Sequence, residues 1–503
     1  MNMRNVLAFD YGASSGRGVI GSFDGEQLTL SEVHRFSNEP VFLGEDFYWD
    51  FLRLFAEMKA GLQKAHAAGG YESVGIDTWG VDFGLLDHAG RLLGMVRHYR
   101  DARNTRAMED LLQQIPVKTL FGSTGSQIQP FNTLFQLHAI REEEPWLLEQ
   151  AQDLLLIPDL FGYLLTGVKH TDYTHASTTG LLRADTQNWD DDLIAQAGLP
   201  RRIFGAVSAP GEIIAPLSPT LCEELEIPTA KLVSVASHDT ASAFAAVPID
   251  MAAAPCDDRL HIAGNAAILS CGTWSLFGAE LSRPLVNQEV QACNFTNEGG
   301  VGGTIRFLKN IMGTWLLQES RRHWARHGKD YSWDELARMA QESEYHVLVD
   351  VDDPSFSPPG NMPRRIAEAC VRARSPAPAS DADTIRCIYR SLAMKYRYTL
   401  DQLKQLTGQP VEIIHLVGGG AKDALLCSLT ADICGVPVAA GPVEATATGN
   451  IIVQLIALGA VKDLAQARQI VGRSFAVKRY QPNDANALSE AEYTAYRAMI
   501  EKE

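Results

Sequence analysis

Apolar runs typical of strands alternate along this chain with amphipathic segments typical of helices. Residues 51–67 (FLRLFAEMKAGLQKAHA) have apolar side chains at helical spacing and predict one helix. Such a helix buries one face against a sheet or another helix. The buried side is expected to carry Leu52, Phe55, Met58 and Leu62.

Three further segments combine strands with turns or helices. Residues 71–87 (YESVGIDTWGVDFGLLD) predict two strands around a turn. Residues 231–247 (KLVSVASHDTASAFAAV) predict a strand that runs into a helix of small residues. Residues 411–434 (VEIIHLVGGGAKDALLCSLTADIC) predict a strand, a glycine turn and a helix. This mixture of strands and helices predicts an α/β fold.

Residues 306–320 (RFLKNIMGTWLLQES) are predicted as a single, largely apolar helix. Asn310, Thr314 and Gln318 follow one another at intervals of four residues and would form a polar stripe on it. A polar stripe on a buried helix needs hydrogen-bond partners, so these side chains are candidates for ligand contacts. Exposure of the stripe to solvent is the alternative.

Two glycine-rich segments resemble each other and indicate two domains of similar construction. Residues 6–21 (VLAFDYGASSGRGVIG) and 266–278 (AAILSCGTWSLFG) both run from an apolar strand through glycine and small hydroxyl residues into a second strand. Chance similarity is the alternative. Just before the second of these segments, residues 247–266 show no clear periodicity of apolar positions. The expected organisation is a domain over 1–246, a connection over 247–265 and a domain over 266–503.

The turn in residues 6–21 has the composition of a phosphate-binding loop. It lacks the lysine and hydroxyl residue of a Walker loop, and the β-forming residues after it exclude the strand-to-helix turn of a dinucleotide-binding motif. A β-hairpin is therefore predicted, in which backbone N–H groups of small residues converge on an anion. The residues expected to contact a phosphate are Ala13, Ser14, Ser15, Gly16 and Arg17.

Asp10 ends the strand before this turn. Its carboxylate is a candidate ligand for Mg²⁺, through a water molecule, because Mg²⁺ prefers oxygen ligands and keeps part of its hydration shell. For the whole segment the alternative is a tight hairpin with an arginine on its surface.

Composition and charge limit the classes of molecule that the protein is expected to bind. With 61 acidic residues against 44 Lys and Arg, the formal net charge is −17, which disfavours nucleic acid and anionic membranes as partners. No apolar run reaches the ~18 residues that cross a bilayer. The apolar stretch before Asp10 is too short for the core of a signal peptide. We therefore expect a cytoplasmic protein with small-molecule substrates, monomeric or homodimeric.

The eight cysteines all lie after residue 221 and include no C-x-x-C pair. This distribution disfavours a zinc site and a disulfide framework. Reduced thiols are expected, in line with a cytoplasmic location.

Several segments together resemble the FGGY family of carbohydrate kinases. They are DYGASSGR, GIDTWGVDF, SHDTASA, CGTWSL, TNEGG with FLKNIMGTWLLQ, and HLVGGGAKDALLCSLTADICGVPV, in the family's order from about residue 5 to about residue 475. The resemblance implies two actin-like (ribonuclease-H-like) ATPase domains, each opened by a β-hairpin phosphate loop, with a catalytic cleft between them. The segment 247–266 is longer than the resemblance leads us to expect.

The resemblance also implies an activity. A kinase of this family transfers the γ-phosphate of Mg-ATP to a sugar hydroxyl. Here the expected acceptor is the primary hydroxyl, O1, of a ketose, with L-rhamnulose favoured. A kinase for another ketose or polyol, such as L-fuculose or L-xylulose, is the nearest alternative. A non-catalytic nucleotide-binding protein on the actin-like fold is the alternative from another class, and such a protein has no need of a carboxylate directed at a substrate.

Asp239, in SHDT, matches the family's catalytic base. It would accept the proton of the attacking hydroxyl, and a position near a helix N-terminus is expected to keep it ionised. Taken in isolation, SHDT is typical of a helix cap at Ser237 or Asp239. His238 and Thr240 would border the sugar, and for His238 a structural role in the core is the alternative.

Further sugar contacts follow from the same resemblance. Gly80 and Asn310 match positions that contact the substrate. Asp77 and Asp82, on either side of Gly80, are candidates to bond sugar hydroxyls.

The nucleotide contacts implied by the resemblance are Thr273, Gln318 and Gly419. Thr273 would approach the phosphates of ATP from the second hairpin. Gly419 lies among three glycines that would let adenine rest against the backbone, or that form only a tight turn.

Overall fold

The computed structural model describes residues 3–249, 260–483 and 489–501, and the chain forms two compact units. The first unit consists of Met1–Asp257, Glu280–Phe307 and Ala445–Phe475. The second consists of Asp258–Ala279, Leu308–Glu444 and Ala476–Glu503. Two segments from the second half of the chain, 280–307 and 445–475, therefore pack with the first unit. The predicted connection, 247–265, falls mostly on residues 250–259, outside the described residues.

The first unit contains most of the strands. They are β1 (Arg4–Tyr11), β2 (Ser15–Phe23), β3 (Leu28–Ser37), β4 (Val41–Leu43), β5 (Asp46–Tyr48), β6 (Ser73–Thr78), β7 (Phe83–Leu86), β8 (Leu92–Leu93), β9 (Asp153–Leu156), β10 (Glu212–Pro216), β11 (Lys231–Ser234) and β14 (Thr296–Gly299). Its helices are α1 (Phe51–Ala67), α2 (Arg103–Gln114), α3 (Val117–Thr124), α4 (Thr133–Glu143), α5 (Pro145–Gln150), α6 (Ile157–Thr166), α7 (Tyr173–Ala176), α8 (Asp191–Gln196), α9 (Pro219–Leu225), α10 (Asp239–Ala245), α11 (Gln288–Cys293), α17 (Ala445–Ala457) and α18 (Leu464–Ser474).

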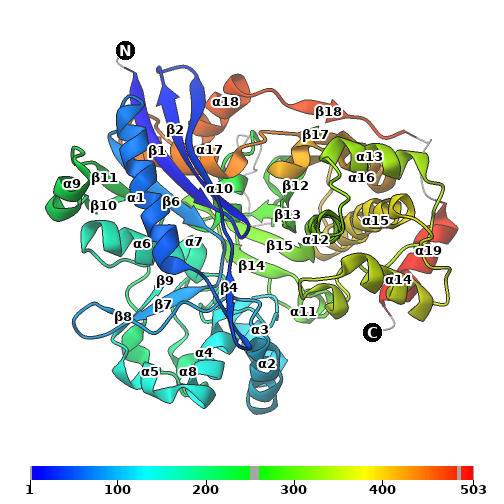
Figure 1. The fold of residues 1–503 in the computed structure, drawn as a ribbon, viewed down its shortest axis with the longest axis horizontal. Coiled ribbons are helices and arrows are strands. Elements are labelled where there is room, and N and C mark those ends of the chain that lie inside the picture. Colours follow the sequence, from blue (N-terminus) through cyan, green and yellow to red (C-terminus); the bar gives the residue numbers. More distant parts are fainter. Residues whose placement is uncertain (1–2, 250–259, 484–488, 502–503) are drawn as a thin grey trace. The chain divides into compact units, whose positions relative to one another are not determined.

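A six-stranded sheet of order β10-β11-β6-β1-β2-β3 forms the centre of the first unit (Figure 1). The strands β1, β2 and β3 are antiparallel neighbours, whereas β6 lies parallel to both β1 and β11. The predicted hairpin is confirmed, since β1 and β2 pair with Asp10 opposite Arg17. On its other side Asp10 lies beside Asp77 of β6.

The two faces of this sheet are covered by different helices. Side chains alternate along a strand, and the β1 side chains Phe9 and Tyr11 lie against α1, where the Tyr11 hydroxyl donates to the Leu54 carbonyl at 3.3 Å. Helices α10 and α17 pack on the opposite face. There Asn450 of α17 donates to the Asp77 carboxylate at 2.6 Å. Asp10 and Asp77 therefore belong to the face that α17 covers.

Helix α1 has the bounds that the sequence predicts, but its buried side differs in part. Leu54, Met58 and Leu62 are buried, whereas Leu52 is 78% exposed. The prediction for Leu52 was wrong because the apolar residues of this helix span more of its circumference than one face can bury. Isolated exposed apolar side chains of this kind are common on protein surfaces.

The segment 71–87 forms the two predicted strands, β6 and β7, but they belong to different sheets. A three-stranded sheet has the order β8-β7-β9, and both outer strands run antiparallel to β7. Buried side chains from this sheet and from helices α2 to α5 form a separate hydrophobic core. The chain between β6 and β7 thus connects two differently packed parts of the first unit, and this connection carries Gly80.

The second unit contributes strands and helices from three segments of the chain. Its strands are β12 (Ala266–Cys271), β16 (Ile413–Val417), β17 (Val438–Ala440) and β18 (Lys478–Tyr480), while β13 (Trp274–Leu281) and β15 (Ile305–Met312) have residues in both units. Its helices are α12 (Trp315–Arg326), α13 (Trp333–Glu342), α14 (Met362–Arg372), α15 (Asp381–Thr407), α16 (Ala424–Cys434) and α19 (Glu490–Ile500). The sheet order is β14-β15-β13-β12-β16-β17-β18.

The second predicted hairpin and the glycine turn are both confirmed. Strands β12 and β13 are antiparallel, and β16 lies parallel to β12. The three glycines 418–420 follow β16, and the last two of them begin a short 3₁₀ helix, η6 (Gly419–Lys422). Helix α16 comes after η6.

The single helix predicted over 306–320 was wrong. The first part of this segment is strand β15, and helix α12 begins only at Trp315. At Gly313, between them, an added Cβ would lie 2.6 Å from the backbone nitrogen of Ser275, so the chain passes against the second hairpin at this point. Pairing within the sheet therefore outweighs the helical spacing of Asn310 and Gln318, which lie on different elements.

Within the described residues, no helix is both long and apolar enough to cross a membrane. The seven described cysteines form no disulfide, and Cys256 lies outside the described residues.

Candidate functional site

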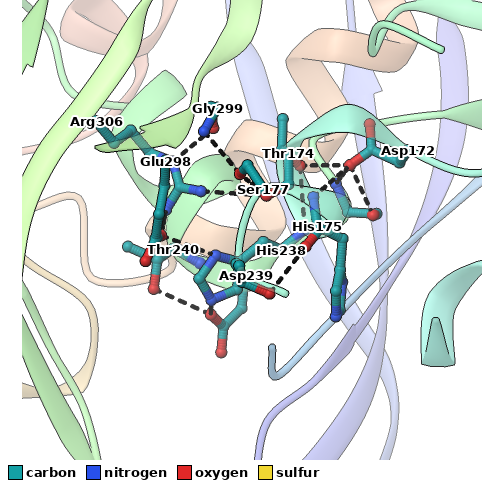
Figure 2. A network of polar contacts seen from close by, with 12 residues as sticks. Asp172, Thr174, His175, Ser177, His238, Asp239, Thr240, Glu298, Gly299 and Arg306 are labelled. Atoms are coloured by element: carbon teal, nitrogen blue, oxygen red, sulfur yellow. Dashed lines mark hydrogen bonds and ion pairs between the residues drawn. The ribbon is translucent and has the colours of Figure 1, made fainter. Parts of the chain in front are cut away.

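The loop that leads into helix α10 is held by a buried polar network (Figure 2). Asp172 Oδ1 accepts hydrogen bonds from the Ser237 backbone N–H at 3.2 Å and from the Ser237 hydroxyl at 2.8 Å. The backbone N–H of His238 donates to the Thr174 hydroxyl at 3.4 Å. These bonds fix the chain immediately before Asp239, so the position of the Asp239 carboxylate is set by its surroundings.

Asp239 is the first residue of α10, and its side chain is 30% exposed. Its Oδ1 accepts the backbone N–H of Thr240 at 2.5 Å and the Thr240 hydroxyl at 3.0 Å. Burial raises the pKa of Asp239, and the charge of Asp10 raises it further, against the opposing influence of His238. The sequence predicts an influence of the helix N-terminus, whereas burial is the largest influence on this pKa. A raised pKa makes this carboxylate a stronger base when it is ionised.

The alternative reading of SHDT is a simple helix cap at Ser237 or Asp239, and the N-cap geometry differs from it. The N-cap residue is His238, and it makes no side-chain capping hydrogen bond. The Ser237 hydroxyl is directed to Asp172 instead. Among the described residues, the hydrogen bonds to Asp239 come from Thr240 and reach Oδ1, so Oδ2 remains for another contact in this partly exposed position.

His238 lies between two carboxylates and beside Gly80. Its Nε2 is 3.4 Å from Asp239 Oδ1, and its Nδ1 is 3.5 Å from Glu298 Oε2. A Cβ at Gly80 would approach His238 Nε2 to 3.1 Å. The structure thus brings together Gly80, His238, Asp239 and Thr240, four of the residues predicted to contact substrate.

The turn that carries Gly80 is strained. Val81 has a φ of 69°, in the left-handed region that β-branched residues rarely adopt, and the Asp82 N–H donates back to the Gly80 carbonyl at 2.9 Å. The Thr133 hydroxyl donates to the Val81 carbonyl at 2.6 Å. Backbone strain that is held by such bonds is often found at ligand-binding turns.

Asp77 and Asp82 are fully buried and bond to the protein. Asp82 accepts from the indole N–H groups of Trp49 at 2.6 Å and Trp79 at 2.9 Å, and from the Gln136 amide at 3.0 Å. Burial nevertheless raises the pKa of Asp82 to about 7. Asp82 therefore anchors the layer of side chains around the Gly80 turn.

A row of charged side chains crosses three neighbouring strands beside Asp239. Arg17 of β2 donates through Nε at 2.9 Å and Nη2 at 2.6 Å to Asp10 Oδ2, and Asp10 lies next to Asp77. Burial raises the pKa of Asp77, and the charges of Asp10 and Asp239 raise it further. The carboxylates of Asp10, Asp77 and Asp239 are therefore close enough to influence one another.

Asp10 and Asp77 fit the Mg²⁺ ion that the sequence predicts at Asp10. Asp77 Oδ1 is buried without a hydrogen-bond partner among the described residues, and carboxylate oxygens are the ligands that Mg²⁺ prefers. Among the described residues, no group of three potential ligands lies close enough to enclose a metal ion. Mg²⁺ is usually held by one or two carboxylates, with water and phosphate oxygens completing its shell.

The turn of the first hairpin is formed by Gly12, Ala13 and Ser14. Asn38 holds it from outside, since its backbone N–H donates to the Ser14 carbonyl and its side chain donates to the Gly12 carbonyl, both at 3.0 Å. Ser14 is exposed, and a Cβ at Gly16 would lie 2.1 Å from the Phe36 ring. The turn is therefore small, fixed and open on one side, as an anion site requires.

In the second unit, Thr273 and Gln318 meet at the turn of the second hairpin. The Thr273 hydroxyl donates to Gln318 Oε1 at 3.2 Å, and the Gln318 amide donates to the Thr314 hydroxyl at 3.0 Å. The turn is bound to the start of α12, because the Thr314 hydroxyl donates to the Gly272 carbonyl at 2.7 Å and the Trp315 N–H donates to the Thr273 carbonyl at 3.1 Å.

The glycine turn after β16 packs on the same hairpin. A Cβ at Gly420 would lie 2.4 Å from Cys271 Sγ, and one at Gly418, whose φ is 82°, would lie 3.1 Å from the Cys271 carbonyl oxygen. Gly419 is exposed and faces open space. Gly418 and Gly420 are thus required by packing, whereas Gly419 presents a bare backbone surface.

Asn310 lies on β15, in the part of that strand that belongs to the second unit. Its predicted contact with the sugar stays a prediction, as do the individual ligand contacts of the other site residues. Sequence reasoning missed Asp172, Glu298 and Arg306, which are distant from Asp239 in the chain. In the fold Asp172 contacts Ser237, Glu298 contacts His238, and Arg306 pairs with Glu298. The signal for Glu298 was present, since it belongs to the TNEGG segment.

Comparisons with known proteins agree with these features. The model of the FGGY carbohydrate kinase N-terminal domain matches residues 5–246, and that of the C-terminal domain matches residues 267–458. A protein of Bacteroides thetaiotaomicron named rhamnulokinase is 41% identical over 490 residues, which cover 97% of this chain and 98% of that protein. A rhamnulokinase of Enterococcus faecalis is 41% identical over 500 residues, covering 98% and 97%.

Solved structures share the fold at lower sequence identity. Ligand-bound xylulose kinase from Lactobacillus acidophilus superposes with a TM-score of 0.76 at 16% identity, over 99% of this chain and 96% of that one. Plasmodium falciparum glycerol kinase with ADP gives a TM-score of 0.73 at 14% identity, over 99% and 97%. Both family models and the near full-length relatives lead to one conclusion. The chain belongs to the FGGY family of carbohydrate kinases, with the mixed α/β, two-domain fold of that family.

Proposed function

We propose that the protein is an ATP-dependent rhamnulokinase, which phosphorylates the primary hydroxyl, O1, of L-rhamnulose. The observation that carries this proposal is the 40–41% identity, over nearly the whole chain, to several proteins named rhamnulokinase. The partly exposed carboxylate of Asp239, held at the start of α10, supports the catalytic part of the proposal.

Asp239 acts as the general base. As the O1 oxygen forms its bond to the γ-phosphorus of ATP, the hydroxyl proton passes to the Asp239 carboxylate, and the bond to the β,γ-bridging oxygen breaks to release ADP. A positioned general base contributes about 10²- to 10⁴-fold in rate. The rest of the catalysis of phosphoryl transfer is positioning and charge stabilisation.

The other site residues position the two substrates. Gly80, His238 and Thr240 border the sugar, and Asn310 is a further substrate contact. The first hairpin turn contacts phosphate oxygens through Ala13, Ser14, Ser15, Gly16 and Arg17. Thr273, Gln318 and Gly419 contact the nucleotide from the second unit. Mg²⁺, held by Asp10 through water, supplies positive charge at the phosphates when it is bound.

A coupled assay of ADP release over a panel of ketoses tests the proposal. We expect kcat/KM for L-rhamnulose to exceed that for L-fuculose, L-xylulose and glycerol, and the product to carry its phosphate on C1. Faster turnover of another ketose would assign the enzyme to that sugar. ATP binding without transfer to any member of the panel would instead favour the non-catalytic alternative.

We further propose that the enzyme acts in the cytoplasm, where ATP is available and thiols stay reduced. Fractionation of the native cells, with the kinase activity followed in each fraction, tests this. The expected oligomeric state, monomer or homodimer, is read directly from light scattering of the purified protein.

A further inference from the structure

A buried ion pair lies behind the candidate base. Arg306 of β15 and Glu298 of β14 are joined by a contact of 2.8 Å between Nη1 and Oε2, and their side chains are only 1% and 6% exposed. Arg306 also donates through Nε to the Gly299 carbonyl at 2.7 Å and through Nη2 to the Thr174 carbonyl at 3.3 Å. The guanidinium is thereby fixed to both strand β14 and helix α7.

This ion pair is costly to bury and adds little to stability by itself. The desolvation of two buried charges commonly equals or exceeds their mutual attraction, so a buried ion pair is weak grounds for a purely stabilising role. In this protein the pair has a third neighbour, because Glu298 Oε2 also lies 3.5 Å from His238 Nδ1. The other ring nitrogen, Nε2, lies 3.4 Å from Asp239.

The four side chains form a continuous series from the core to the partly exposed base (Figure 2). The imidazole ring of His238 lies between the two carboxylates, and each of its nitrogens faces one of them. Arg306 fixes the inner carboxylate, Glu298, and the outer one is the candidate base.

We propose that Glu298, held in place by Arg306, is a positioning residue for phosphoryl transfer, which fixes the orientation of the His238 ring against the Asp239 carboxylate. This inference rests on the proposed function in one respect, the role of Asp239 as the base. Glu298 touches neither substrate in this account and acts only through His238.

The charge environment of Asp239 explains why such a partner is needed. Burial and the charge of Asp10 both raise the pKa of Asp239, and His238 opposes them. Besides these groups, the charged or titratable side chains around Asp239 and His238 are Arg17, Asp77, His175, Glu298 and Arg306. A His238 ring turned away from Asp239 would no longer oppose the influence of Asp10, and the pKa of Asp239 would rise.

The state of Glu298 is consistent with this role. Burial alone would raise the pKa of Glu298, but the charge of Arg306, with contributions from His238, lowers it below its ordinary value. Glu298 is therefore a permanent negative charge at neutral pH. A permanent carboxylate at Nδ1 fixes the orientation of the ring, as an acid–imidazole pair does in other enzymes.

The test compares wild-type enzyme with Glu298→Gln and Glu298→Asp. For Glu298→Gln we expect kcat to fall about 10- to 100-fold at pH 7, part of what a positioned base contributes. The KM for ATP should stay within about twofold of wild type, because the nucleotide contacts lie elsewhere. The acidic limb of the kcat profile should move to higher pH, and Glu298→Asp, which keeps the charge, should restore part of both changes.

A second variant separates positioning from folding. Glu298→Gln alone leaves the buried charge of Arg306 without its partner, which is itself destabilising. The double variant Glu298→Gln/Arg306→Gln removes both charges and keeps amide donors near the Gly299 and Thr174 carbonyls. The proposal predicts that the double variant keeps the low kcat and the shifted acidic limb even where its melting temperature returns to that of wild type. Recovery of wild-type kcat and pH profile in the double variant would overturn the proposal.

A measurement without substrate keeps this test independent of the proposed function. In protein with ¹³C-labelled histidine, the His238 resonance, assigned by its loss in His238→Asn, reports the surroundings of the ring. We expect this resonance to lie at a different chemical shift in Glu298→Gln than in wild type, because the ring loses the carboxylate that orients it. Identical resonances in the two proteins would contradict the inference. If L-rhamnulose proves not to be the acceptor, the kinetic arm is run with the ketose that the panel identifies.

Discussion

The β1–β2 hairpin and the β12–β13 hairpin are built alike and carry different chemistry. Each is an antiparallel pair whose first strand has a parallel neighbour, β6 for β1 and β16 for β12. The first turn is flanked by charged side chains, since Arg17 and Asp10 face each other across the strands. The second turn, CGTWSL, contains no charged residue and is held by neutral hydrogen bonds to α12.

The difference shows how one local shape serves two tasks. In the first unit, a charged group lies at the ends of the neighbouring strands β2, β1 and β6 and at the start of α10. It consists of Arg17, Asp10, Asp77 and Asp239, and charges in such a partly buried position influence one another strongly. In the second unit, Thr273 and Gln318 offer hydroxyl and amide groups whose contributions are individually small. Substitutions in the first unit should therefore affect chemistry, and substitutions in the second should affect packing and nucleotide affinity.

The largest expected effect is that of Asp239→Asn in the first unit. The amide keeps the size of the side chain and can still accept the Thr240 N–H, but it cannot take up a proton. We expect kcat to fall about 10²- to 10⁴-fold, with ATP affinity within about twofold of wild type. Steady-state kinetics and calorimetric titration with ATP check the two halves of this prediction. Turnover near that of wild type would show that Asp239 is not the general base.

A matched pair of substitutions tests packing in the second unit. Gly420→Ala places a Cβ 2.4 Å from Cys271 Sγ, whereas Gly419→Ala adds one in open space. Overpacking of this kind commonly costs about 1–3 kcal/mol, so Gly420→Ala should lower the free energy of unfolding by that amount. Gly419→Ala should change it by less than about 0.5 kcal/mol. Chemical denaturation of both variants provides the comparison, and equal stabilities would show that the turn does not depend on contact with Cys271.

A smaller effect is expected for Thr273→Val, which removes the hydroxyl and keeps the shape of the side chain. One neutral hydrogen bond is worth about 0.5–1.5 kcal/mol, so the KM for ATP should rise about threefold to tenfold. The kcat of this variant should change less than its KM, because no reacting atom is touched. Thr273→Ser, which keeps the hydroxyl, is the control. A loss of kcat comparable with that of Asp239→Asn would contradict the proposal that the second hairpin affects nucleotide affinity and not the chemical step.

The smallest effect concerns Asp82, beneath the Gly80 turn. Burial raises its pKa from 3.8 to about 7. Ionisation in the folded state is thus unfavourable, and the stability that neutral Asp82 contributes is lost as the pH rises from the ordinary aspartate range through about 7. Tryptophan fluorescence should change with a midpoint near pH 7, because both Trp49 and Trp79 donate to this carboxylate. Asp82→Asn should abolish that step. A midpoint that persists in the variant would assign it to another group.

Local pattern was sufficient for much of the fold. Both hairpins, the bounds of α1 and the strand–helix order around SHDT are set by neighbouring residues, and the sequence predicted them. It failed over 306–320, where the spacing of Asn310 and Gln318 fits a helix but residues 305–312 pair within a sheet. Strand pairing depends on residues distant in sequence, so periodicity within one segment cannot reveal it.

The site was predictable only as far as its motifs extend. Motif resemblance supplied Asp239, His238 and Gly80, and the fold brings these three together. It did not supply Glu298 or Arg306, because their role depends on the approach of β14 and β15 to the start of α10. Nor could it show that Arg17 pairs with Asp10, since that contact follows from strand register.

The central claim is that the Asp239 carboxylate accepts the proton of the attacking hydroxyl, and the pH dependence of a single turnover tests it most directly. The base acts when ionised, and because burial raises its pKa, the rate of phosphoryl transfer should fall below a pH that lies above the ordinary aspartate range. We expect the rate constant from rapid-quench experiments with saturating Mg-ATP and L-rhamnulose to fall tenfold per pH unit on that acidic limb, as the loss of one proton-accepting group requires. In Asp239→Asn the limb should be absent. A wild-type rate that does not change with pH while the protein stays folded, or the same limb in Asp239→Asn, would contradict the claim.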